Sequence, residues 1–205
     1  MFKRVLFLLV IFALAFSFCG KKSEKKSTEE TAKKEELNLP KGREIAVIET
    51  KFGKIYLDFL ENDAPKHVEN FKKLAKEGFF NGTTFHRVVP NFVIQGGDPL
   101  SKDDDRANDG TGGPGYTIPA EIKAKHLKGY VGAARMPDNV NPQKESNGSQ
   151  FYICLRDLPM LDGNYTVFAK VIAGMDVVEK IAQQKTDERD NPIEKIEMKV
   201  YLIKK

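Results

Sequence analysis

Two runs, residues 44–50 and 54–60, mix apolar and polar residues in the manner of strands. In the second run every other residue is large and apolar: Ile55, Leu57 and Phe59. A period of two is typical of a strand with one buried face. The link Lys51-Phe52-Gly53 between the runs is short and contains glycine. We therefore predict an antiparallel hairpin here.

The segment after this hairpin changes to a helical period. Asn62-Asp63 offers a helix cap, Pro65 suits a first turn, and Gly78 supplies a stop signal. Between them, apolar residues recur three and four positions apart: Val68, Phe71, Leu74 and Ala75. Such a stripe indicates a helix packed against a core. We assign no chemistry to it.

The rest of the chain predicts further strands and a second helix. Runs rich in branched and aromatic residues are expected to form strands at residues 83–88, 92–95, 130–135, 150–155, 167–171 and 193–203. Residues 175–184 carry Val177, Val178 and Ile181 on one side and predict a helix. Many strands with two helices suit a closed barrel, because closure removes exposed strand edges. The pattern alone, however, establishes only a mostly β domain.

The stretch FHRVVPNFVIQGGD, residues 85–98, places polar side chains within apolar strands. Alternation along its first strand puts Arg87 on the same face as Phe85 and Val89. A proline ends that strand, and a second strand runs to Gln95. An arginine beside so much apolar surface is costly without partners. Arg87 is therefore either tied into a polar network, such as a pairing with a carboxylate, or available to a ligand.

The N-terminus predicts an export signal. Met1-Phe2-Lys3-Arg4 is basic, and residues 5–18 form an apolar run that is short for a membrane-spanning helix. Cys19 and a polar tract follow, which resembles a bacterial lipoprotein signal, where the cysteine is lipidated and becomes the mature N-terminus. Phe18 departs from the small residue usual before that cysteine, so an ordinary signal or an uncleaved anchor remains an alternative. In each case the domain is expected outside the cytoplasm.

Three regions follow from these patterns. Residues 1–19 are the expected signal, residues 20–43 a charged flexible tether, and residues 44–205 a single domain. The tether has almost no large apolar residue, so it cannot bury enough surface to offset the entropy of ordering. The domain is long enough to bury a sizeable core.

Composition argues against several classes of function. The net charge of +4 is mild, and no basic stripe with interleaved aromatics indicates nucleic-acid binding. The three histidines lie far apart in the sequence without acidic or thiol neighbours at ligand spacing, so we expect no metal. Cys154 sits in an apolar run and is expected to be a buried thiol without a disulfide partner.

Several separated blocks resemble the cyclophilins, the peptidyl-prolyl cis-trans isomerases that bind X-Pro peptides. Besides residues 85–98, these blocks are residues 108–121, 129–135 and 148–181, in the family's order. The short connection GPGYTIPAE looks more like the bacterial branch than the eukaryotic cytosolic one. The resemblance implies a closed eight-stranded antiparallel barrel capped by two α-helices. It also implies a monomer that needs no cofactor and acts on proline-containing polypeptides.

The resemblance further assigns roles to single residues. Arg87 matches the catalytic arginine, and Gln95 matches the glutamine that orients it. The lining of the proline pocket is matched by Phe92, Val93, Tyr152, Met160 and Leu161. The groove beside it, where backbone groups pair with an extended peptide, is matched by Ala134, Arg135 and Gln150. Tyr165 stands where many members have histidine, and residues 110–113 match a loop that borders the neighbouring pocket.

Three departures from the family concern the site. Met160 stands where an aromatic is frequent, which implies weak binding of cyclosporin-type ligands, and Tyr152 replaces a more usual Phe. Residues 136–149 form a longer loop than is common, which bears on the peptides that fit over the groove. The sequence thus predicts an exported prolyl isomerase of the cell envelope. The alternative is a proline-peptide binding module or holdase chaperone with little turnover.

Overall fold

The computed structural model describes residues 42–204, so the predicted signal with Cys19 and nearly all of the predicted tether lie outside the described residues. The strands are β1 (Glu44–Thr50), β2 (Gly53–Phe59), β3 (Arg87–Val89), β4 (Val93–Gly96), β5 (Tyr130–Ala133), β6 (Phe151–Cys154), β7 (Val167–Ala173) and β8 (Lys199–Lys204). The α-helices are α1 (Pro65–Lys76) and α2 (Met175–Ala182), and the short 3-10 helices are η1 (Pro99–Lys102) and η2 (Pro159–Leu161). Within residues 42–204, no helix is long and apolar enough to cross a membrane.

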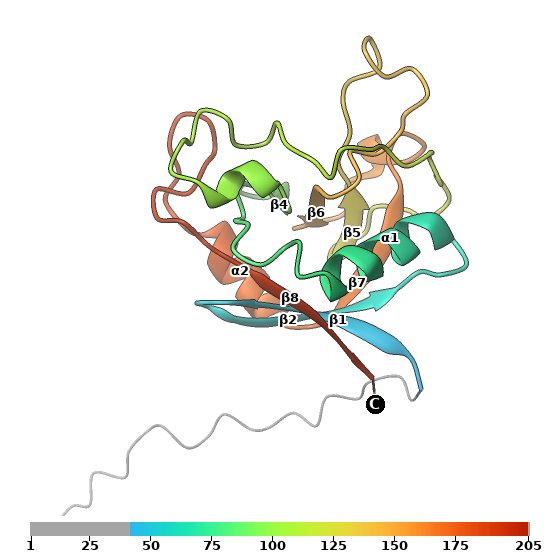
Figure 1. Ribbon diagram of the computed structural model, residues 1–205, viewed down its shortest axis with the longest axis horizontal. Coiled ribbons are helices and arrows are strands. Elements are labelled where there is room, and N and C mark those ends of the chain that lie inside the picture. The colour runs from blue at the N-terminus through green and yellow to red at the C-terminus, as the bar shows by residue number, and fades with distance from the viewer. Residues whose placement is uncertain (1–41, 205) are drawn as a thin grey trace, which may run out of the picture. The chain divides into compact units, whose positions relative to one another are not determined.

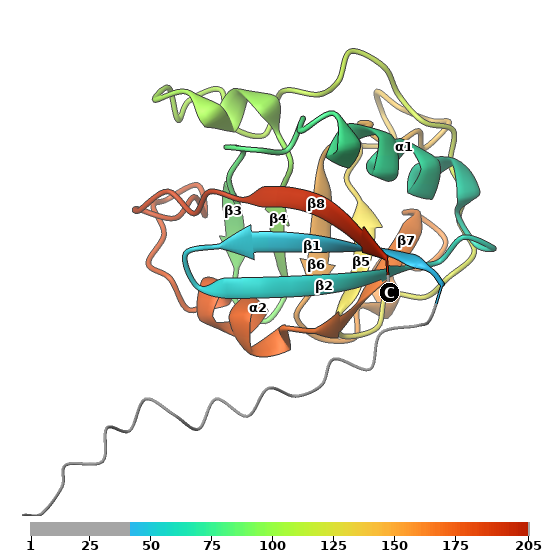
Figure 2. The same cartoon turned by 60° about the horizontal axis from the view of Figure 1, so that its bottom comes forward.

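All eight strands belong to one antiparallel sheet in the order β3-β4-β6-β5-β7-β2-β1-β8. The sheet curves around the core, with α1 packed against β7 and β8, and α2 against β2, β3 and β4 (Figures 1 and 2). The two outer strands are connected through a bridge between Thr84 and Glu197, just before β3 and β8, rather than by a ladder. The predicted mostly β fold of eight antiparallel strands with two helices is confirmed.

The first hairpin forms as predicted, and its second strand begins at Gly53. Gly53 has a φ of +129°, a backbone conformation that favours glycine. Ile48 of β1 faces Ile55 of β2 on one side and Val200 of β8 on the other, and all three are buried. Cross-strand pairs of branched side chains are what stabilise such a sheet.

Helix α1 begins at Pro65 as predicted, but the predicted cap at Asn62-Asp63 is wrong. Its N-cap is Ala64, whose side chain makes no capping bond. The free backbone N–H groups of Lys66 and His67 instead donate to the Glu121 carboxylate, at 3.2 and 3.1 Å. This carboxylate comes from a distant part of the chain, so the local sequence carries no sign of it. Gly78 ends the helix with a φ of +70°, as predicted.

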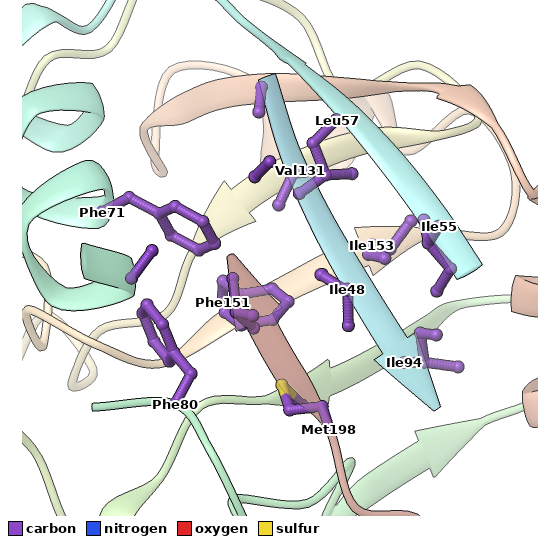
Figure 3. Close-up of a cluster of buried hydrophobic side chains, with 14 of the residues drawn as sticks. Ile48, Ile55, Leu57, Phe71, Phe80, Ile94, Val131, Phe151, Ile153 and Met198 are labelled. Carbon is purple, nitrogen blue, oxygen red and sulfur yellow. The ribbon is translucent and has the colours of Figure 1, made fainter. Parts of the chain in front are cut away.

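The core is organised around the α1 stripe. The Phe71 ring lies 4.8 Å from the Phe80 ring and 5.6 Å from the Phe151 ring, between centroids. Figure 3 shows these rings against the aliphatic side chains of the sheet, among them Ile48 and Val131. Aromatic pairs at such distances add to the free energy gained from burial alone. These contacts confirm the prediction that the apolar stripe of α1 packs against the core.

Two predicted strands begin several residues later than expected. Of residues 83–88 only the last two are in a strand, because the chain before Arg87 pairs irregularly with residues 196–198 instead of joining a ladder. Alternation is therefore broken, and Phe85 lies in the core together with Val88, not on the face of Arg87. Of residues 193–203, the strand includes only those from Lys199 onward.

Candidate active site

A cavity of about 190 Å³ lies beside strands β3, β4 and β6. Its lining brings together side chains that are far apart in the sequence: Arg87, Phe92, Val93, Gln95, Ala134, Arg135, Tyr152, Leu161 and Tyr165. All nine are residues that the sequence predicts for the site. The fold thus places two cationic side chains, Arg87 and Arg135, and one amide, Gln95, at an apolar hollow.

Two predicted site residues are outside this lining. Met160 lies in η2 with 56% of its surface exposed, while its neighbour Leu161 faces the cavity. Gln150 is buried, and its side-chain oxygen accepts a hydrogen bond from Gln95 Nε2 at 3.0 Å. Gln150 therefore supports the site through Gln95, whereas Met160 is exposed to solvent.

Arg87 and Gln95 are direct partners in the β3–β4 ladder, so their side chains project from the same face. Arg87 Nη1 lies 3.4 Å from Gln95 Oε1, which leaves most of the guanidinium donors available. The nearest carboxylate, Asp190, is 3.9 Å from Arg87 Nε, and both side chains are partly exposed. An exposed ion pair at that distance contributes little to stability, so a structural salt bridge does not hold the Arg87 guanidinium.

A chain of hydrogen bonds continues from Gln95 into the loop before β5. Gln150 Nε2 donates to the carbonyls of Gly110 and Gly112, at 2.9 and 2.8 Å. The backbone N–H groups of the same two glycines donate to the carboxylate of Asp98, which is fully buried. Asp98 is the last residue of the FHRVVPNFVIQGGD stretch, and its anchoring role was not predicted. No local pattern could have shown it, because its partners lie 12 and 14 residues away.

The apolar part of the cavity rests on a small cluster next to the main core. Val93, Tyr152, Cys154 and Leu158 are buried there, with Phe92, Ala134, Leu161 and Tyr165 packed against them. Cys154 is buried, as predicted, and its burial raises the pKa of the thiol to about 12. The cavity is thus held by packing on one side and by polar contacts on the other.

Arg135 and Tyr165 close one side of the groove. The Arg135 guanidinium lies 4.5 Å from the centre of the Tyr165 ring, a cation–π contact, and Arg135 Nε donates to the carbonyl of Asn164 at 2.7 Å. The Ala134 backbone is already paired with Gln150 and Asn147. Of the three predicted groove residues, only Arg135 has a backbone N–H and C=O without a partner among residues 42–204. Those two groups are available to an extended peptide.

Sequence reasoning missed two polar residues beneath the pocket. His126 is fully buried, with Nε2 2.9 Å from the Tyr152 hydroxyl and Nδ1 2.9 Å from Asp162 Oδ1. The three residues are separated by at least ten positions, so spacing gives no signal. Within residues 42–204, no group of three or more His, Cys, Asp or Glu side chains is arranged to hold a metal ion.

Together, the fold and this site define a mostly β protein of eight antiparallel strands with an apolar pocket beside an arginine–glutamine pair, an arrangement suited to binding an extended peptide. Residues 45–201 match the family described as cyclophilin type peptidyl-prolyl cis-trans isomerase/CLD. The chain belongs to this family, which confirms the predicted family and enzyme class.

Named relatives agree. A peptidyl-prolyl cis-trans isomerase of Helicobacter pylori is 43% identical over 143 residues, covering 67% of this chain and 80% of the relative. One from Schizosaccharomyces pombe is 38% identical over 154 residues, covering 74% and 93%. Among solved structures, the Cryptosporidium parvum cyclophilin type isomerase crystallised in the presence of the dipeptide Ala-Pro aligns with a TM-score of 0.69. It is 29% identical, and the match covers 78% of this chain and 99% of that one.

Proposed function

We propose that the protein isomerises X-Pro bonds of exported polypeptides in a bacterial cell envelope, as a monomer without a cofactor. In this proposal the proline ring occupies the apolar cavity, Arg87 acts on the reacting amide, and Gln95 orients Arg87. The observation that carries it is the position of Arg87, partly exposed at the edge of that cavity, with its nearest carboxylate among residues 42–204, the half-exposed Asp190, 3.9 Å away. The Ala-Pro dipeptide of the related crystal structure supports proline-containing ligands for this groove.

The chemistry fits these side chains. Rotation about the peptide bond faces a barrier of roughly 18–20 kcal/mol, because resonance gives the C–N bond double-bond character. In the twisted state the proline nitrogen becomes pyramidal, and its lone pair can accept a hydrogen bond. Arginine offers several donors and keeps its charge. An acceleration of about 10⁵-fold needs only about 7 kcal/mol of stabilisation beyond that of the ground state.

Neither a nucleophile nor a metal is required for this rotation. A few directed hydrogen bonds at the edge of a partly dry groove are sufficient, because they act on charge that shifts only in the transition state. The groove would also hold the chain around the proline, using the Arg135 backbone groups and the pocket lined by Phe92, Tyr152 and Leu161.

Refolding of a proline-limited protein distinguishes an enzyme from a holdase. An isomerase is expected to shorten the slow phase when present at a small fraction of the client's concentration, since each molecule turns over many times. A binding module would only suppress aggregation, and only near equimolar amounts. Loss of the effect at sub-stoichiometric amounts would therefore contradict the proposal and favour the alternative function.

The envelope location is proposed from the sequence of residues 1–19. Cell fractionation with mass analysis of the mature N-terminus tests it. Lipidation at Cys19 is expected, and a Cys19→Ala variant should release the protein from the membrane fraction, whereas Cys154→Ala should not. A cytosolic protein that keeps Met1 would contradict the proposed location without affecting the proposed activity.

A further inference from the structure

The aromatic ring at the base of the proline pocket carries a hydroxyl that is turned away from the cavity. Tyr152 is 5% exposed, and its hydroxyl has one hydrogen-bond partner among the described residues, His126 Nε2 at 2.9 Å. Gly132 on the neighbouring strand leaves the room for it, since a Cβ there would collide with the Tyr152 hydroxyl. The space beside Gly132 and the hydrogen bond to His126 therefore fix the position of the hydroxyl beneath the pocket.

The acidic partner of His126 determines which ring nitrogen carries the hydrogen. The Asp162 oxygen that lies near Nδ1 also accepts the His126 backbone N–H, at 2.8 Å. A carboxylate can only accept, so Nδ1 of the neutral imidazole must be the donor. Nε2 is then an acceptor, and the Tyr152 hydroxyl donates to it.

Protonation of His126 reverses the last contact. Nε2 then becomes a donor towards the Tyr152 oxygen, and the hydroxyl hydrogen loses its one acceptor among the described residues. A buried donor without a partner is costly. A proline ring in the cavity would exclude water from this region, which penalises the charged imidazolium further.

We propose that His126 is a positioning residue for the proline pocket, and that its protonation weakens substrate binding by releasing the Tyr152 hydroxyl from its acceptor. The proposal rests on the function proposed above. In this proposal, His126, Asp162 and Tyr152 together determine how tightly the pocket binds proline in mildly acidic solution.

The groups that face His126 leave it as the one that titrates in this range. Hydrogen bonds from His126 lower the pKa of Asp162, and burial raises the pKa values of Tyr152 and Cys154. The Tyr165 ring contacts His126 edge-on, and the Arg135 guanidinium, which stays charged, lies over the Tyr165 ring. Burial lowers the pKa of His126, and Asp162 opposes this shift only in part. His126 therefore gains its proton at a pH below the usual pKa of 6.5.

The test compares KM and kcat for an Ala-Pro peptide from about pH 7.5 down to about pH 4.5, because His126 changes charge at a lower pH than an ordinary histidine. In the wild type, KM is expected to rise at least roughly threefold at the lower pH, with kcat changed less, because one buried hydrogen bond is lost. His126→Gln supplies an acceptor for Tyr152 and a donor for Asp162 but does not titrate. Its KM is expected to be nearly independent of pH.

His67→Gln is the matched control. His67 is also buried, with Nδ1 2.7 Å from Glu121 and Nε2 2.8 Å from the Ser146 hydroxyl, but it does not line the cavity. This variant should keep the wild-type rise in KM. A wild-type KM that is flat with pH, or a rise that persists in His126→Gln, would overturn the inference. Absence of isomerisation at the higher pH would instead overturn the proposed function itself.

A direct titration provides the second readout, for the case that His126→Gln does not fold. The ring signals of His126 in the wild-type protein should show a lower pKa with Ala-Pro peptide bound than without it, because binding and protonation oppose each other reciprocally. Equal values in the two states would contradict the proposal.

Discussion

Arg87 and Gln95 occupy directly opposed positions of the β3–β4 ladder, and their side chains meet at 3.4 Å beside the cavity. The same amide group donates to Gln150, so Gln95 links the arginine to the buried polar loop behind it. The orientation of Arg87 thus depends on strand register rather than on a salt bridge.

Replacing Gln95 with alanine should lower kcat/KM about tenfold, since the guanidinium loses the group that orients it, worth roughly 1.4 kcal/mol in the transition state. The measurement is the rate of cis–trans exchange of an Ala-Pro peptide. Gln183→Ala, at an exposed position after α2, is the control and should behave as wild type. Equal activity of both variants would show that Arg87 does not need Gln95.

Asp98 is expected to matter at a distance from the pocket. Its carboxylate accepts the N–H groups of Gly110 and Gly112, whose carbonyls hold Gln150. Asp98→Asn replaces one acceptor oxygen with a donor and should lower kcat/KM several-fold. It should also reduce the free energy of unfolding by about 2 kcal/mol, since hydrogen bonds to a charged group are lost.

Asp103→Asn is the comparison for that variant. Asp103 also accepts a backbone N–H in the same loop, that of Asp105, but it is exposed and has no contact with Gln150. Its activity and stability should stay close to wild type. If Asp98→Asn also leaves kcat/KM unchanged, the loop does not control the site.

Stability should fall as the solution becomes mildly acidic. Burial lowers the pKa values of His67, His86 and His126 below the ordinary 6.5, so the unfolded chain binds more protons in that range. The stability that the neutral imidazoles contribute is fully present above the pKa of histidine in the unfolded chain. It is lost as the pH falls through the lower pKa values of the folded protein. The urea midpoint should therefore be lower at about pH 5 than at about pH 8.

His86 should contribute to this loss, because neither of its ring nitrogens has a hydrogen-bond partner among residues 42–204, and burial outweighs the opposing charges of Asp98 and Asp109. A His86→Phe variant should show a smaller decrease of the urea midpoint between the two pH values. An unchanged decrease would mean that His86 stays neutral or finds a partner on protonation.

Cyclosporin-type ligands should bind weakly. Met160 stands where the resemblance places an aromatic, and more than half of its surface is exposed. Met160→Trp should increase affinity for such a ligand at least several-fold in a calorimetric titration, since an aromatic ring adds buried contact area. Nanomolar binding by the wild type would contradict the expectation.

The helices and most strands could be predicted because local periodicity determines them. Helix α1 and the β1–β2 hairpin follow from stripes and turns that lie within a few residues, such as Gly53 and Gly78. The cap by Glu121 and the position of Phe85 could not be predicted. Both depend on contacts with segments far along the chain.

The site residues also separate into those that local motifs predict and those that depend on distant segments. The resemblance located nine of the cavity residues, because they belong to contiguous motifs. The supporting residues Asp98, His126 and Asp162 remained hidden, since each acts through a partner on a different loop or strand. Pairings of this kind arise only once the sheet has brought the segments together.

The most direct test is the isomerisation rate of an Ala-Pro peptide with residues 42–205 of the chain, beside Arg87→Ala. Arg156→Ala is the matched control, because Arg156 is exposed and its one side-chain hydrogen bond among residues 42–204 is to the carbonyl of Asn91. We expect fast exchange in the wild type and the control, and at least a roughly tenfold loss in Arg87→Ala. Full activity in Arg87→Ala, or no activity in the wild type while proline peptides still bind, would contradict the account.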